Sequence, residues 1–131
     1  MYFLTTAIEN KAKADSDLIG SVKAFRFLEV DQKTKCPYIT YKIINEKGLY
    51  TFSGNGEDVL IEFSIFSDNK YEKEISEIYF YLDRCFDNKV LVFAAGYECV
   101  SCIRTGASGI ERVEDNCLMK TVEFRIKIRG V

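Results

Sequence analysis

Two cysteines of this chain have the spacing of a metal-binding or redox pair. Cys99 and Cys102 form a C-x-x-C motif. A structural zinc site needs four ligands, and the chain has no histidine and no second C-x-x-C motif. The pair also lies inside a strand-like run, where positions i and i+3 point to opposite faces, so chelation by both side chains is awkward. We therefore expect Cys99 and Cys102 to be packing residues.

Three acidic side chains form a second group that could bind a metal or take part in catalysis. Glu111, Glu114 and Asp115 could bind a divalent cation or take part in acid–base catalysis. Their spacing matches no recognised ligand pattern, and acids in loops are common. We favour a solvated, charged loop over a metal or catalytic site.

The remaining motifs exclude several classes of function. The absence of histidine removes the commonest general base and the histidine-oriented nucleophiles. No phosphate-binding loop exists, and Gly54-Asn55-Gly56 is followed by a strand pattern where a dinucleotide fingerprint needs a helix. We therefore predict no catalytic residue, no cofactor and no metal.

A basic row closes the chain without the features of a nucleic-acid site. Arg125, Lys127 and Arg129 lie on one side of the last strand pattern, but no aromatic residues are interleaved with them. The net charge of −2 also gives no long-range attraction for nucleic acid or anionic membrane. We expect these bases to pair with acids on neighbouring strands, such as Glu62.

Length and composition predict one domain over residues 1–131. About two-thirds of the surface of a chain this long is buried on folding, which supports a core without metals or disulfides. A hydrophobic content of 47% argues against disorder, yet no apolar run approaches the roughly 20 residues that span a bilayer. Five cysteines, an odd number, and the lack of a signal-peptide pattern lead us to expect folding inside the cell.

Residues 57–88 are predicted to form the central folding unit, a strand that leads into an amphipathic helix. In the strand pattern, Val59, Ile61, Phe63 and Ile65 share one side. From residue 71 the period becomes helical, and the apolar stripe includes Tyr71, Ile75, Ile78, Tyr79, Leu82, Cys85 and Phe86. Such a helix, packed back on its strand, buries both apolar faces.

The other elements complete an α+β architecture. We predict a helix over residues 2–14, a capped turn over 15–20, and strands over 24–28, 38–44, 93–104 and 118–129, with a bend at Gly96 in the strand over 93–104. Residues 49–52 are predicted to form an arm between two turns, and residues 105–116 a long loop. The expected fold is a mostly antiparallel sheet of about four to five strands with two helices on one face.

The order of several segments resembles a known family. These segments are Asp17-Leu18-Ile19-Gly20-Ser21-Val22 after a short helix, Cys36-Pro37-Tyr38-Ile39-Thr40-Tyr41-Lys42, the unit from Val59 through Ser67-Asp68 into the long helix, and the final Thr121-Val122-Glu123-Phe124-Arg125-Ile126-Lys127-Ile128. Over nearly the whole chain this order resembles the tail-completion, or tail-terminator, proteins of tailed bacteriophages and phage-tail-like particles.

The resemblance implies a non-enzymatic structural protein of the virion. Such proteins form a ring, usually hexameric, at the head-proximal end of the tail tube, and they join the tube to the head–tail connector. Neither a nucleic-acid sequence nor a membrane is an expected partner. Eight side chains are our candidates for contacts with other subunits or partners: Tyr50, Phe52, Leu60, Phe66, Glu111, Arg112, Glu114 and Asp115.

Three alternatives stay open at this point. The chain could be another head–tail connector or minor tail subunit. A small ligand-binding regulatory domain with the same two-layer architecture is the alternative from another class, and an enzyme that uses Glu111, Glu114 and Asp115 with a metal is the third.

Overall fold

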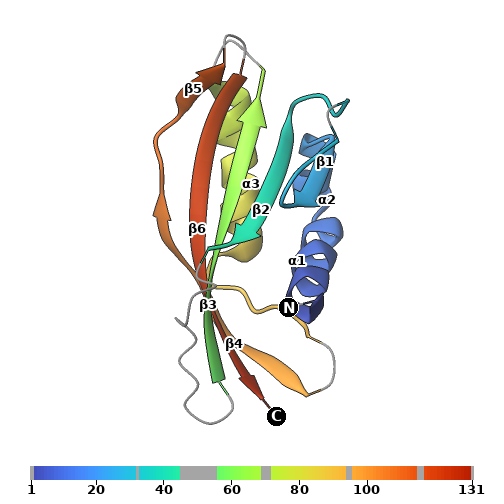
Figure 1. Ribbon diagram of the computed structural model, residues 1–131, viewed down its shortest axis with the longest axis vertical. Coiled ribbons are helices and arrows are strands. Elements are labelled where there is room, and N and C mark those ends of the chain that lie inside the picture. The colour runs from blue at the N-terminus through green and yellow to red at the C-terminus, as the bar shows by residue number, and fades with distance from the viewer. Residues whose placement is uncertain are drawn as a thin grey trace.

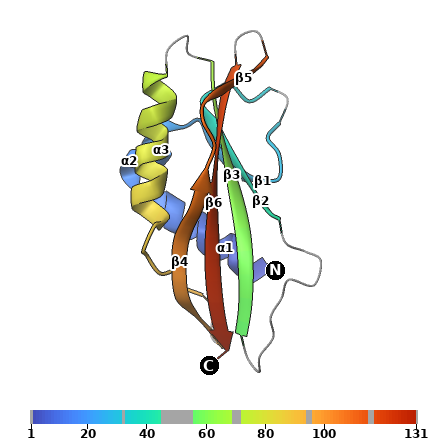
Figure 2. The ribbon, with the colours of Figure 1, turned by 90° about the vertical axis from the view of Figure 1, so that its left-hand side faces the viewer.

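A computed structural model describes residues 2–31, 33–44, 56–68, 72–93, 96–114 and 117–130. Figure 1 shows these residues as a curved sheet with helices packed on one of its faces, and Figure 2 shows the same layers from the side. The elements, in chain order, are α1 (Tyr2–Ala14), α2 (Ser16–Ser21), β1 (Ala24–Phe27), β2 (Tyr38–Ile43), β3 (Gly56–Ser67), α3 (Lys73–Phe86), β4 (Tyr97–Ala107), β5 (Glu111–Glu114) and β6 (Cys117–Gly130). The predicted α+β class is confirmed.

The strands follow the order β1-β2-β3-β6-β4, and β5 pairs with β6 beside β4. The β1–β2 pair is parallel, and every other pair among the described strands is antiparallel. The described part of the chain therefore contains six strands and three helices, where the sequence predicted four to five strands and two helices. The additional strand is β5, and the additional helix is α2, which overlaps the predicted turn over residues 15–20 and extends to Ser21.

The predicted central unit is confirmed as β3 followed by α3. The inner side of β3 supplies Ile61 and Phe63, which are almost completely buried. They pack with Ile78 and Leu82 of α3, which are buried as well, in the single large core between the sheet and the helices. The alternating pattern of the strand and the 3.6-residue pattern of the helix thus meet face to face, as their spacing requires.

The junction of α1 and α2 is held by an aspartate. Asp15 Oδ1 accepts hydrogen bonds from the backbone N–H groups of Asp17 and Leu18, each at 3.1 Å, which caps α2. Arg84 of α3 pairs with Asp17 at 2.9 Å and lies 3.5 Å from Asp15. These contacts place the two N-terminal helices against α3 and leave the opposite face of the sheet uncovered by the described helices (Figure 2).

Two predictions for the C-terminal half are wrong. The fourth strand begins at Tyr97 instead of residue 93, because Gly96 has a φ of 102°, which belongs to a turn. It then continues to Ala107, and residues 111–114 form β5, so most of the predicted loop over residues 105–116 is sheet. The sequence did not predict β5 because its residues are mostly charged. An edge strand can be formed by charged residues when its backbone pairs with a neighbouring strand, here β6.

The lower ends of β3, β4 and β6 extend past the helices as a twisted ribbon (Figure 1). Here Gly56 opposes Arg129, and Glu98 opposes the same residue from β4. The predicted arm over residues 49–52, with Tyr50 and Phe52, lies outside the described residues.

Candidate interaction surfaces

The outer face of the sheet carries a ladder of opposite charges. Ion pairs join neighbouring strands across it: Lys42 with Glu62, Asp58 with Arg125, and Glu98 with Arg129. Hydrogen bonds from Arg125 lower the pKa of the Asp58 carboxyl below its usual value. The expected pairing of the basic row with acids on neighbouring strands is therefore confirmed for Arg125 and Arg129, whereas Glu62 takes Lys42 as its partner.

The two candidate apolar residues of β3 also lie on the outer face. Phe66 is half-buried and stacks on Tyr38 of β2, with ring centroids 4.9 Å apart and 27° between the planes. Met119 of β6 opposes Phe66 on its other side, so the three side chains form an apolar row across one end of the sheet. Leu60 is half-buried opposite Arg125. Contact with a partner remains a prediction for Leu60 and Phe66.

The candidate charged residues near β5 do not converge on one point. Glu111 opposes Met119 and is exposed on the outer face, while Arg112 opposes Leu118 and belongs to the inner face. The backbone of Glu114 pairs with Cys117, and Asp115 lies outside the described residues. Among the residues that the structure describes, no group of three or more cysteine, aspartate or glutamate side chains is arranged to hold a metal ion.

The C-x-x-C pair lies on one face of the sheet, and the prediction of opposite faces is wrong. Cys99 opposes Ile128 and Cys102 opposes Ile126, and these two isoleucines share the inner face. A β-bulge between Cys99 and Ser101 adds one residue to β4, so the three-residue step along the chain becomes a two-residue step along the sheet. Burial raises the pKa of the Cys102 thiol to about 12. Both side chains pack against the core.

Exposed apolar residues gather beside β4, where the sequence reading placed no surface. Val100 and Ile103 of β4 are about half exposed, and Val92, in the segment before it, is 85% exposed. The sequence Val90-Leu91-Val92 already contained a sign of this surface, because Leu91 is buried while Val90 and Val92 are exposed. An alternation over only three residues fits an edge strand as well as an exposed apolar surface, so this segment alone does not predict the surface.

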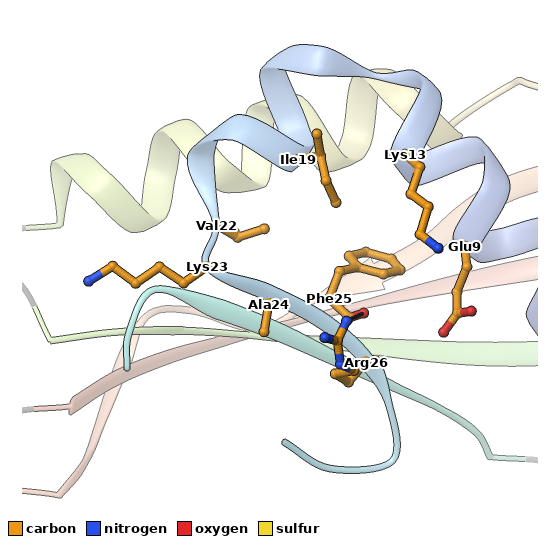
Figure 3. Close-up of a pocket in the computed structure, with 8 residues that line it drawn as sticks. All are labelled: Glu9, Lys13, Ile19, Val22, Lys23, Ala24, Phe25 and Arg26. Atoms are coloured by element: carbon orange, nitrogen blue, oxygen red, sulfur yellow. Dashed lines mark hydrogen bonds between the residues drawn. The ribbon is translucent and has the colours of Figure 1, made fainter. Parts of the chain in front are cut away.

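A cleft lies beside β1, beneath the first two helices (Figure 3). Its volume is about 240 Å³, and its lining consists of Glu9, Lys13, Ile19, Val22, Lys23, Ala24, Phe25 and Arg26. Figure 3 shows Glu9 and Lys13 descending from α1 toward β1, while Ile19 points down from α2. Burial, together with the charge of Glu9, raises the pKa of the Tyr41 phenol, whose ring centroid lies 5.3 Å from that of Phe25. The residues that line it are four apolar residues, three cationic residues and one anionic residue.

Comparison with known proteins shows a shared fold. No model of a protein family matches the chain, and no curated protein sequence matches it. Among solved structures, a chain from the virion of a native gene transfer agent particle matches with a TM-score of 0.79 and 17% sequence identity, over 97% of this chain and 95% of that chain. A second solved structure matches with a TM-score of 0.64 and 8% identity, over 97% and 94% of the two chains.

None of the helices in the described part of the chain is both long and apolar enough to cross a membrane.

Proposed function

We propose that this chain is a non-enzymatic structural protein of a phage or phage-tail-like particle. One observation carries the proposal, namely that the fold matches a virion chain of a gene transfer agent particle over nearly the full length of both chains. The finer assignment, a tail-terminator ring, rests on the resemblance in the order of sequence segments. In that role the ring would cap the head-proximal end of the tail tube and join it to the head–tail connector.

The shape of the sheet is compatible with ring assembly. A ring needs head-to-tail contacts, in which two different surfaces of each subunit meet. Because β1 lies at one side of the sheet and β4 and β5 lie at the other, the protein offers such a pair of different edges (Figure 1). A hexamer is the stoichiometry that the resemblance implies.

The proposed contacts with the tube, the connector or a neighbouring subunit involve the candidate residues in two places. The apolar row that contains Phe66 is one, because a half-buried aromatic pair at the end of an uncovered face can be buried further by a partner. Strand β5, which carries Glu111, Arg112 and Glu114, is the other, and the candidate Asp115 lies outside the described residues. Tyr50 and Phe52 belong to the predicted arm, which would reach a neighbouring subunit.

Imaging of the assembled particle tests the proposal. The chain, tagged at one terminus, would be purified with particles from a lysate and located by electron microscopy with a label for the tag. We expect one ring of label at the head-proximal end of the tail tube. Label at the connector or at the distal tip would favour the alternative connector or minor tail roles, and particles without any label would refute a virion role.

A biochemical measurement separates the proposal from the ligand-binding alternative. The mass of the purified chain, measured by light scattering, should rise when purified tail tubes are added, because ring subunits can wait for the tube before they assemble. A control with Phe66→Ser removes half of the stacked aromatic pair without touching the inner core. Unchanged binding to tubes by this variant would exclude the apolar row from the tube contact.

A further inference from the structure

Two short edge strands lie at opposite sides of the sheet. β1 pairs with β2 alone, and β5 pairs with β6 alone, among the described strands. Each strand is four residues long and leaves one row of backbone N–H and C=O groups outside the sheet. Figure 1 shows β5 at the upper left of the sheet and β1 at the right. Such rows are templates for pairing with another strand.

The exposed charges of the two strands are opposite, and they project from the same face. Arg26 opposes Thr40 on the outer face of the sheet, and Glu111 opposes Met119 on that face. Both charged side chains are exposed. In the described part of the chain, neither Arg26 nor Glu111 forms an ion pair. The hydrogen bond of Arg26 goes to the carbonyl oxygen of the adjacent Phe25, at 3.2 Å.

The longer edge strand β4 is less suited to this pairing. Its two bulges, near Val100 and Thr105, interrupt the row of backbone groups in two places, whereas β5 has one such irregularity, between Arg112 and Glu114. Its charged side chains also have partners inside the molecule. Glu98 pairs with Arg129, and Arg104 pairs with Asp83 of α3. The unpaired opposite charges therefore select β5, and not β4, as the complement of β1.

We propose that β5 of one copy pairs with the free edge of β1 of a second copy, so that Glu111 faces Arg26 across the junction. The sheet would then continue from subunit to subunit. Because the two strands differ, the contact is head-to-tail and leaves a free β1 on one copy and a free β5 on the other. This inference rests on the proposed function, because the second copy is taken to be the neighbouring subunit of the ring. It adds which surfaces of the two subunits meet.

A charge exchange tests the pairing in the full chain. Arg26→Glu and Glu111→Arg, made separately, place like charges across the junction and should each weaken self-association by about tenfold or more. The double variant restores opposite charges and should regain most of the wild-type affinity. Analytical ultracentrifugation over a concentration series, at low and at high salt, measures the dissociation constants, and the wild-type affinity should fall as salt rises.

The control variant is Glu77→Arg, which makes the same change at an exposed position of α3. It should associate like the wild type. Amide hydrogen exchange reports the backbone contact independently, since association should slow exchange in residues 24–27 and 111–114 but not in residues 97–107. A wild-type chain that stays monomeric at every concentration, both without and with purified tail tubes, overturns the proposal, and so does a double variant no better than the single variants.

The outcome is separable from that of the proposed function. Self-association through β1 and β5 by a chain that is absent from tails would retain this contact and refute the tail role. A ring located on the tail tube, with assembly unchanged by both charge reversals, would support the tail role and refute the pairing of β1 with β5.

Discussion

Replacement of Phe63 by alanine should remove the centre of the core. Phe63 lies on β3 with 1% of its surface exposed. Its ring centroid is 5.0 Å from that of Phe86, 5.6 Å from Tyr41, 5.7 Å from Phe124 and 5.9 Å from Phe25. These four rings come from α3, β2, β6 and β1, so a single side chain joins the helical layer to three other strands.

The expected loss of stability lies at the upper end of the usual range. A buried Phe→Ala change costs about 3–5 kcal/mol, and the value depends on how far the surroundings collapse into the space. Collapse is restricted here because β3 is paired at Phe63 with β2 on one side and with β6 on the other. We therefore expect about 4–5 kcal/mol, which is a large share of the roughly 5–15 kcal/mol that stabilises a typical domain.

Urea unfolding followed by circular dichroism measures the effect. With a slope of about 2 kcal/mol per molar urea, the midpoint should fall by about 2 M. Phe80→Ala is the matched control, because Phe80 is 59% exposed on α3, and it should cost less than about 1 kcal/mol. Equal losses for the two variants, or a loss below about 1.5 kcal/mol for Phe63→Ala, would refute this account of the core.

Three further predictions concern single side chains. The hydrogen bonds of Arg125 hold the pKa of Asp58 below its unfolded value, so their stabilisation is present above about pH 4 and is lost as pH falls through the folded-state pKa. Asp58→Asn should therefore lower the free energy of unfolding by less than about 1 kcal/mol at neutral pH, and the difference should vanish in acid unfolding titrations. Cys102, with a pKa raised by burial to about 12, should react with iodoacetamide at pH 8 only after unfolding, and mass spectrometry of labelled peptides would reveal native-state labelling that contradicts this. Arg104→Ala removes the guanidinium nitrogen that lies 2.9 Å from Asp83 Oδ1. Because both side chains of this ion pair are partly exposed, the variant should cost less than about 1 kcal/mol in urea unfolding. In a double-mutant cycle with Asp83→Ala, losses that simply add would argue against the pair.

The sequence predicted helices and strands correctly where one side of the element is buried and the other side is exposed to solvent. The predicted first helix over residues 2–14 coincides with α1, and the predicted last strand lies within β6. In β6, Val122, Phe124, Ile126 and Ile128 are buried, and the residues between them are exposed or half-buried. The two-residue period of β6 therefore records a real difference in solvent contact, which is the quantity that a hydrophobic pattern measures.

β5 could not be found in this way, because its environment is similar on both sides. Glu111, Arg112 and Val113 are all exposed, so no alternation marks the strand. Its structure comes from backbone pairing with residues 117–119 of β6. The pattern of residues 111–114 alone does not contain that pairing. The acidic residues that resembled a solvated loop are compatible with an edge strand, where charge also discourages aggregation.

The bulge in β4 shows a second limit. Nothing in Glu98-Cys99-Val100-Ser101 identifies the extra residue, yet that residue decides which face each later side chain occupies. Without the bulge, Cys99 and Cys102 would face opposite sides, and one cysteine would have to leave the core. The partner strand settles the choice, because Ile126 and Ile128 gain apolar neighbours only if both cysteines turn inward.

The outer face of the sheet limits where a partner can gain binding energy. Each ion pair across its middle already neutralises two charges, so a partner that covered Asp58 and Arg125 would have to desolvate both without supplying a new counter-charge. Covering the row of Tyr38, Phe66 and Met119 carries no such cost, because half-buried apolar surface gains from leaving water. Binding at the apolar end is consequently favoured over binding at the centre of the face.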